Sequence, residues 1–259
     1  MKKVGLVLSG GGVRGIAHIG VLKVLDQLNY KFSAISGCSI GALIGAFYSA
    51  GRTGAEIEKF FLTGNLYRNF ELSFNTLGIK NIKKLEKMFV DFMGTDDFKD
   101  LQTPLYINST NVSTGKEVVF SRGSIIKAIR ASIAVPGVFS PLNIKNEYYI
   151  DGGVINELPF SILPDEIKHY ILVDVSPFKI LKNEKNINLV KILQASIKIM
   201  QKQIVAEKIK SLKKDKYILI VPSTSNYRLL ENEKKFREIL RLGEKGAGNK
   251  KNMIKNLIK

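Results

Sequence analysis

The chain has one cysteine, two histidines and no hydrophobic run long enough to cross a membrane. The lone Cys38 excludes a disulfide within the chain and is typical of a reducing compartment. No stretch approaches the roughly 18 apolar residues that a membrane span requires. The N-terminus carries two lysines and only a short apolar stretch before three glycines, which predicts a strand rather than a cleavable signal peptide. We therefore expect a cytoplasmic protein without a transmembrane segment.

Acidic residues are scarce in the last third of the chain. Residues 179–259 hold 21 lysines and arginines but only 7 aspartates and glutamates, whereas residues 1–178 hold 19 and 16. Such a surface attracts polyanions, either nucleic acid or anionic lipid. Few aromatic residues are interleaved with the basic ones, which disfavours nucleic acid. We interpret the charge as a surface for peripheral contact with an anionic membrane; the simpler alternative is a solvated helix face.

Length and composition are those of an ordinary globular protein. The chain has 259 residues, of which 45% are hydrophobic and 24% are charged, enough for one large α/β domain with a substantial core. We find no internal repeat, no low-complexity linker and no shift in composition that would mark a boundary. We therefore predict a single domain over residues 1–259, whose last third, residues 179–259, is basic and largely helical.

A serine stands between two glycines at a predicted junction of strand and helix. The stretch Ser36-Gly37-Cys38-Ser39-Ile40-Gly41 follows a predicted strand over 31–35 and precedes a predicted helix over 42–50. A G-x-S-x-G pattern in this context is typical of a nucleophile elbow, because a tight turn needs small residues around the serine. The helix start then offers N–H groups to a developing oxyanion. The alternative is an ordinary glycine-rich turn.

A glycine-rich loop follows the first predicted strand, Val4 to Ser9. Its sequence, Gly10-Gly11-Gly12-Val13-Arg14-Gly15, also fits a dinucleotide fingerprint, which needs an acidic residue after the next strand. No carboxylate is found there. The carboxyl ends of parallel strands meet at one edge of a sheet, so the glycine loop and Ser39 are expected to be neighbours. The glycine amides would then form the oxyanion hole, and Ser39 would be the nucleophile. Arg14 would steady the loop or meet an anionic head group.

Asp151 is the candidate base. It follows a predicted strand over 148–150 and precedes Gly152 and Gly153, so its carboxylate can point into a site at the sheet edge; the alternative is a plain Asp-Gly turn. The order Ser39, Asp151, His169 also matches an α/β-hydrolase triad. However, His169 begins an apolar strand, whereas a triad histidine follows a late strand. His18 lies inside the first helix, where packing or a hydrogen bond is its expected role.

The remaining elements alternate between strands and helices. The expected strands are 105–111, 116–120, 169–175 and 217–221, and the expected helices are 54–62, 82–93, 124–132, 188–213 and 231–259, the last broken around 243–248. Residues 66–79 are either an irregular connection or a cap over an apolar site. The helix over 188–213 carries lysines on one side and apolar residues on the other, namely Leu189, Leu193, Ile197, Met200 and Ile204.

Three motifs in this order, G-G-G-x-[KR]-G, G-x-S-x-G and D-G-[GA], resemble the patatin-like phospholipase family, as does the block from Ala131-Ser132 to Pro136. The resemblance implies a three-layer α/β/α sandwich with a mostly parallel sheet. It also implies a lipid acyl hydrolase that needs no metal or other cofactor. Ser39 would be the nucleophile, Asp151 the base and the amides of Gly10–Gly12 the oxyanion hole, with support from Arg14, Gly37, Gly41 and Gly152.

Two other interpretations of the same residues stay open. One is an esterase of the α/β-hydrolase type that uses Ser39, Asp151 and His169. The other is a protein that binds lipid or nucleotide and catalyses nothing. Ester hydrolysis that requires Ser39 and Asp151 but not His169 would favour the two-residue mechanism over both.

Overall fold

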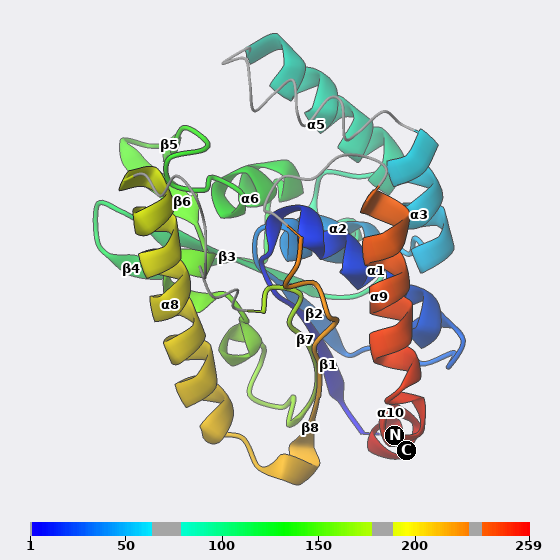
Figure 1. The fold of residues 1–259 in the computed structure, drawn as a ribbon. Coiled ribbons are helices and arrows are strands. Elements are labelled where there is room, and N and C mark those ends of the chain that lie inside the picture. The colour runs from blue at the N-terminus through cyan, green and yellow to red at the C-terminus, as the bar shows by residue number, and fades with distance from the viewer. Residues whose placement is uncertain (1, 64–78, 178–188, 228–234) are drawn as a thin grey trace.

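A mixed β-sheet lies at the centre of the molecule (Figure 1). The computed structural model describes residues 2–63, 79–177, 189–227 and 235–259. In these ranges eight strands form one sheet in the order β5-β6-β3-β2-β1-β7-β8, with β4 paired to β3. The strands are β1 (Val4–Leu8), β2 (Ala34–Gly37), β3 (Leu105–Asn111), β4 (Lys116–Phe120), β5 (Leu142–Ile144), β6 (Glu147–Asp151), β7 (His169–Val173) and β8 (Tyr217–Ile220).

The middle of the sheet is parallel. β1 pairs in parallel with β2 and β7, β2 with β3, and β7 with β8, whereas β4 and β6 are antiparallel to β3. Leu8, the last residue of β1, lies opposite Gly37 of β2 and Val173 of β7. The segments that follow these strands therefore meet at the carboxyl edge of the sheet. The predicted α/β fold with a mostly parallel sheet is confirmed.

Helices cover both faces of the sheet. Leu6 and Leu8 of β1 face one hydrophobic core, and Val7 faces a second, as the two-residue period of a strand requires. In Figure 1, α8 lies on one side of the sheet and α1, α2, α3 and α9 lie on the other. The helices are α1 (Ile16–Asp26), α2 (Ile40–Ser49), α3 (Gly54–Thr63), α5 (Ile79–Met93), α6 (Ile125–Ser132), α7 (Gly153–Asn156), α8 (Leu189–Lys210), α9 (Phe236–Gly248) and α10 (Lys251–Ile258).

The predicted break in the last helical stretch is found directly after Gly248, where α9 ends before α10 begins at Lys251, whereas Gly243 lies inside α9. Gly243 serves close packing instead. A Cβ on Gly243 would lie 2.0 Å from the carbonyl oxygen of Ala17, and one on Gly20 would lie 2.0 Å from that of Leu240. Helices α1 and α9 therefore approach each other at backbone distance, which only glycine permits at these positions.

The expected segregation into an apolar and a lysine-bearing side is seen in the first half of α8, with the lysines facing inward, whereas in the second half Val205 is buried and Lys210 is exposed. Lys198 and Lys202 point into the molecule, whereas Leu189, Leu193 and Met200 are exposed. Of the stretch 66–79, only the first residue of α5 lies inside the described residues, so the predicted cap lies outside them. None of the helices in the described ranges is long and apolar enough to cross a membrane.

Candidate active site

Ser39 occupies a strained turn between β2 and α2. Its backbone has φ 53° and ψ −124°, a positive-φ conformation that residues other than glycine rarely adopt. A Cβ on Gly37 would lie 2.5 Å from the carbonyl oxygen of Gly41, and one on Gly41 would lie 2.3 Å from that of Leu8. Glycine is thus required at both positions of the predicted motif, and the serine side chain stands at the start of α2.

A side chain from α6 holds the backbone of this turn. The N–H of Ser39 donates a hydrogen bond to Oγ of Ser132 over 2.7 Å, and both residues are buried. The sequence assigns no such role to Ser132, because its partner is a backbone amide 93 positions away. Its membership of the Ala131–Pro136 block was the only available signal.

The glycine loop after β1 lies against the Ser39 turn. A Cβ on Gly10 would lie 3.5 Å from Cβ of Ser39, so the loop and the turn are neighbours, as predicted. The N–H of Gly10 donates to the carbonyl oxygen of Glu157 over 3.1 Å and is therefore engaged away from the serine. This leaves the amides of Gly11 and Gly12 as the candidate oxyanion donors of the loop.

Two side chains support the glycine loop. Nε of Arg14 donates to the carbonyl oxygen of Gly11 over 3.2 Å, the steadying contact expected from the sequence. Nε2 of the buried His18 lies 2.9 Å from the carbonyl oxygen of Ser9. A carbonyl oxygen only accepts, so Nε2 carries the ring proton. Burial lowers the pKa of His18 to about 4, so the imidazole is neutral at physiological pH.

Asp151 ends β6 and reaches the same edge of the sheet. The Ser39 side chain is close enough to this carboxylate to lower its pKa. Its Oδ1 also lies 2.7 Å from the N–H of Gly153 and 3.6 Å from Sγ of Cys38. A Cβ on Gly152 would lie 2.5 Å from the carbonyl oxygen of Asn108, so this position too requires glycine. The structure thus places Asp151 against Cys38, the residue that precedes the predicted nucleophile.

The electrostatic surroundings of Asp151 suit a base. Burial raises the pKa of Asp151 to about 6, while the polar groups of Ser39, Gly153 and Cys38 oppose the rise. An aspartate in water has a pKa of about 3.9 and is a weak base. With a pKa near 6, the carboxylate is still ionised at neutral pH and accepts a proton more readily.

A buried cluster of charges lies behind the glycine loop. Glu157, which follows α7, forms ion pairs with Lys198 and, over 3.2 Å, with Lys202 of α8. Lys202 also pairs with Asp174 over 2.8 Å. Burial would raise the pKa of Asp174, but the charge of Lys202 and its hydrogen bonds outweigh this and leave that pKa lowered. Nothing in the sequence pattern predicted that α8 would be fixed to the site by its lysines.

His169 lies at the opposite edge of the sheet. It begins β7 opposite Val4, whereas Ser39 follows the strand whose end pairs with Leu8. Four residues of strand, about 13 Å, separate these two levels. Nε2 of His169 lies 3.4 Å from Nζ of Lys216, which is also at that edge. The structure therefore does not bring His169 to the serine and aspartate.

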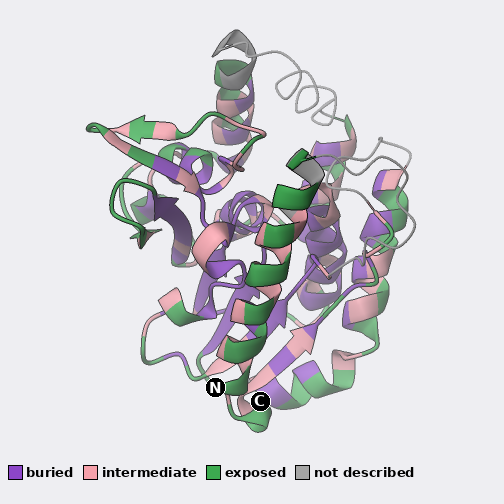
Figure 2. Cartoon of the chain, turned by 60° about the vertical axis from the view of Figure 1, so that its left-hand side comes forward, coloured by how far each residue is buried: buried purple, intermediate pink, exposed green. Residues whose placement is uncertain are grey.

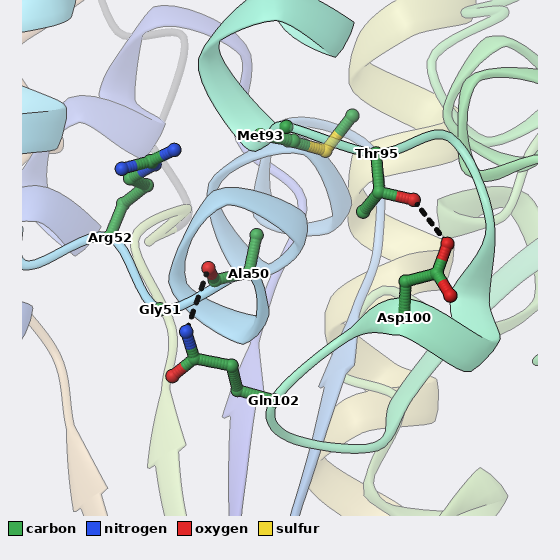
Figure 3. Close-up of a pocket in the computed structure, with 8 residues that line it drawn as sticks. Ala50, Gly51, Arg52, Met93, Thr95, Asp100 and Gln102 are labelled. Atoms are coloured by element: carbon green, nitrogen blue, oxygen red, sulfur yellow. Dashed lines mark hydrogen bonds between the residues drawn. The ribbon is translucent and has the colours of Figure 1, made fainter.

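One cavity of about 410 Å³ lies at the far end of α2 from Ser39 (Figure 3). Arg52, Met93 and Gln102 are among its lining residues, and Thr95 donates to Asp100 across it over 2.9 Å. The 10 residues of α2 separate it from the serine by about 15 Å. Within the described ranges, no cluster of three histidine, cysteine, aspartate or glutamate side chains is placed to hold a metal.

Comparisons with known proteins identify relatives of this chain. A family model described as patatin-like phospholipase matches residues 6–164. An uncharacterised NTE family protein of Mycobacterium tuberculosis is 35% identical over 161 residues, which are 61% of this chain and 45% of that protein. The lysophospholipase NTE1 of Cryptococcus neoformans is 31% identical over 188 residues, which are 67% of this chain and 11% of that protein. The matches thus span less than half the length of either relative.

Among solved structures, VipD from Legionella pneumophila has a similar fold. Its crystal structure aligns with a TM-score of 0.55 and 16% sequence identity, and the alignment covers 96% of this chain and 66% of VipD. At this level of identity the similarity concerns the fold alone.

Proposed function

Because the chain belongs to the patatin-like phospholipase family, we propose that it hydrolyses carboxylic esters of lipids, with Ser39 as the nucleophile and Asp151 as the base. The observation that carries this proposal is the buried carboxylate of Asp151 against Cys38, directly beside the strained Ser39 turn at the same edge of the sheet. The name lysophospholipase, given to a relative that is 31% identical, supports a lipid ester as the substrate.

The reaction follows from these contacts. Asp151 takes the hydroxyl proton as Oγ of Ser39 bonds to the ester carbonyl carbon, and the carbonyl oxygen becomes an oxyanion. Amides of Gly11 and Gly12 and of Ile40, at the start of α2, receive that charge. The bond between the carbonyl carbon and the alcohol oxygen then breaks, and the alcohol leaves with the proton from Asp151. Water then attacks the acyl-enzyme in the same way and frees Ser39 and the fatty acid.

The position of His169 supports the two-residue mechanism over the triad. A triad histidine must stand between the serine and the aspartate. Here Asp151 lies against Cys38, the neighbour of Ser39, and His169 starts a strand at the other edge of the sheet. We also propose peripheral contact with an anionic membrane, supported by the 21 basic and 7 acidic residues of segment 179–259.

The test is hydrolysis of p-nitrophenyl butyrate, which is soluble, and of lysophosphatidylcholine by wild type and three variants. We expect Ser39→Ala and Asp151→Ala to lower kcat/KM by at least about a thousand-fold. His169→Ala is the matched control and should stay within about two-fold of wild type. Equal loss in all three folded proteins would restore the triad. Full activity of Ser39→Ala would overturn the proposal.

A further inference from the structure

The first half of α8 presents an apolar face to solvent. The exposed fractions of its side chains are 74% for Leu189, 44% for Ile192, 55% for Leu193, 47% for Ile199 and 56% for Met200. These positions lie on one face of the helix, on which exposed Ser196 separates the first three from the last two. Scattered exposed leucines are ordinary, but five large apolar side chains on one stripe of a helix mark a surface that binds something.

The second half of the same outward face is different. Gln203, Ala206, Glu207 and Lys210 are its exposed residues, and Glu207 and Lys210 form an ion pair there over 2.7 Å. In Figure 2, α8 lies in front of the sheet with exposed residues along its outward side. The apolar stripe is therefore confined to the half of the helix that comes first in the chain.

Contacts on the inner face prevent the helix from turning its stripe inward. Lys198 and Lys202 are ion-paired with Glu157, and Lys202 also with Asp174. Turning the stripe toward the core would break these buried pairs and leave carboxylates without partners, which is costly. The exposure of the stripe is thus built into the fold.

The apolar half of α8 extends beyond the edge of the sheet that carries Ser39. Nε2 of Gln201 donates to the carbonyl oxygen of Gly153 over 2.8 Å, two residues from Asp151, so this point of α8 is level with the site. After α8 ends, β8 begins at the amino edge, and β8 runs parallel to β7. The first half of α8, residues 189–200, therefore rises from the level of Gln201 past the carboxyl edge (Figure 1).

We propose that the stripe of Leu189, Ile192, Leu193, Ile199 and Met200 is the surface on which the protein docks to an anionic phospholipid bilayer. The inference rests on the proposed lipid-ester hydrolysis, because a substrate held in a membrane must be met at the membrane surface. Apolar side chains on one helix face together with an excess of positive charge are typical of helices that bind lipid interfaces. Residues 179–191, which lead into the stripe and contain its first position, hold four lysines and one glutamate.

The test uses two double variants that add the same charge to the two halves of the outward face. Leu193→Glu/Met200→Glu places carboxylates in the stripe, and Gln203→Glu/Ala206→Glu places them in the polar half. All four positions are exposed, so both variants should fold. Binding is measured by sedimentation with vesicles of phosphatidylcholine and phosphatidylglycerol in equal amounts, in a Ser39→Ala background that leaves the vesicles intact.

We expect the stripe variant to bind these vesicles at least about ten-fold more weakly than the parent, and the polar-half variant to stay within about two-fold. With Ser39 restored, both should hydrolyse p-nitrophenyl butyrate as wild type does. Equal loss in both variants, or no vesicle binding by the parent, would overturn the proposal, and so would undiminished binding to phosphatidylcholine alone. Lipid-free dimers that only the stripe variant dissociates would assign the face to a second copy instead. Failure of the proposed function would appear separately, as absent turnover of the soluble ester.

Discussion

The backbone N–H of Ser39 and the hydroxyl of Ser132 are joined by a hydrogen bond of 2.7 Å. Ser39 lies in a positive-φ turn, and Ser132 is the last residue of α6. Strained backbone persists only where its surroundings enforce it. The Ser132 side chain is one such restraint, and it acts on the residue that we propose as the nucleophile.

Removing this restraint should reduce turnover more than binding. We expect Ser132→Ala to lower kcat on p-nitrophenyl butyrate by about ten-fold or more, because the loss of a partner for a buried N–H costs about 1–3 kcal/mol. KM should change less than two-fold. Ser49→Ala is the matched control, since Ser49 is also buried and its hydroxyl has no hydrogen-bond partner. Equal kcat values for the two variants would refute a positioning role for Ser132.

The pH dependence of hydrolysis should report the ionisation of Asp151. A base must be unprotonated to accept the serine proton, and burial raises the pKa of this carboxyl to about 6. The value of kcat/KM should therefore fall about ten-fold per pH unit below about pH 6 and reach a plateau above it. A profile that stays flat down to about pH 4 would show that Asp151 titrates as an ordinary carboxyl.

The raised pKa of Asp151 also predicts that its ionised carboxylate lowers the stability of the folded protein at neutral pH. The pKa of Asp151 is about 6 in the folded protein and near that of a free aspartate, about 3.9, in the unfolded chain. Between these values the folded state binds more protons, so the free energy of unfolding falls as pH rises, by up to about 3 kcal/mol in total. Asp151→Asn removes this pH-dependent contribution to the free energy of unfolding. We expect it to be inactive, more stable than wild type at about pH 8, and equally stable near pH 4.

Urea unfolding at both pH values provides the measurement. Asparagine can still accept the hydrogen bond from the N–H of Gly153, so the variant tests charge more than shape. The decisive comparison is the change in the stability difference with pH. A difference that is the same at both pH values would contradict the assigned pKa.

The contact between α1 and α9 allows a prediction on packing. Gly243→Ala should destabilise the protein by about 1–3 kcal/mol or more, because the new methyl group would lie 2.0 Å from the carbonyl oxygen of Ala17. Gly248→Ala, at the end of the same helix, has nothing within 4 Å of the new Cβ and should be neutral or stabilising by up to about 1 kcal/mol. Midpoints of urea unfolding would rank the two variants. The reverse order would mean that the helices do not pack at backbone distance.

The sequence predicted the parts of the site that depend on short-range geometry. The glycines around Ser39 and after Asp151 are needed because a side chain would collide within the same turn or with the adjacent strand, so they leave a local pattern. Parallel pairing of β1 and β2 then brings the first two motifs to one edge, which topology alone implies.

Contacts between distant segments left no comparable pattern. The Ser132 hydroxyl accepts a hydrogen bond from the backbone N–H of Ser39, and the backbone carbonyl of Glu157 accepts one from the N–H of Gly10. Every residue at these positions would offer a similar backbone group, so the sequence does not reveal these contacts. The orientation of α8 was also hidden, because buried carboxylates on other segments draw Lys198 and Lys202 inward. The predicted helix break extended to Gly243, since a glycine that permits close packing looks the same as one that ends a helix.

The order of pairing in the sheet has a consequence for protein synthesis. β1 and the glycine loop leave the ribosome before β7 and α9 do, but Ser9 donates its N–H to Val173, and α1 packs on α9, which ends at Gly248. A nascent chain therefore carries all three motifs before the segments that support the first of them exist. The glycine loop and the helix that follows it therefore gain these contacts only once translation has passed α9.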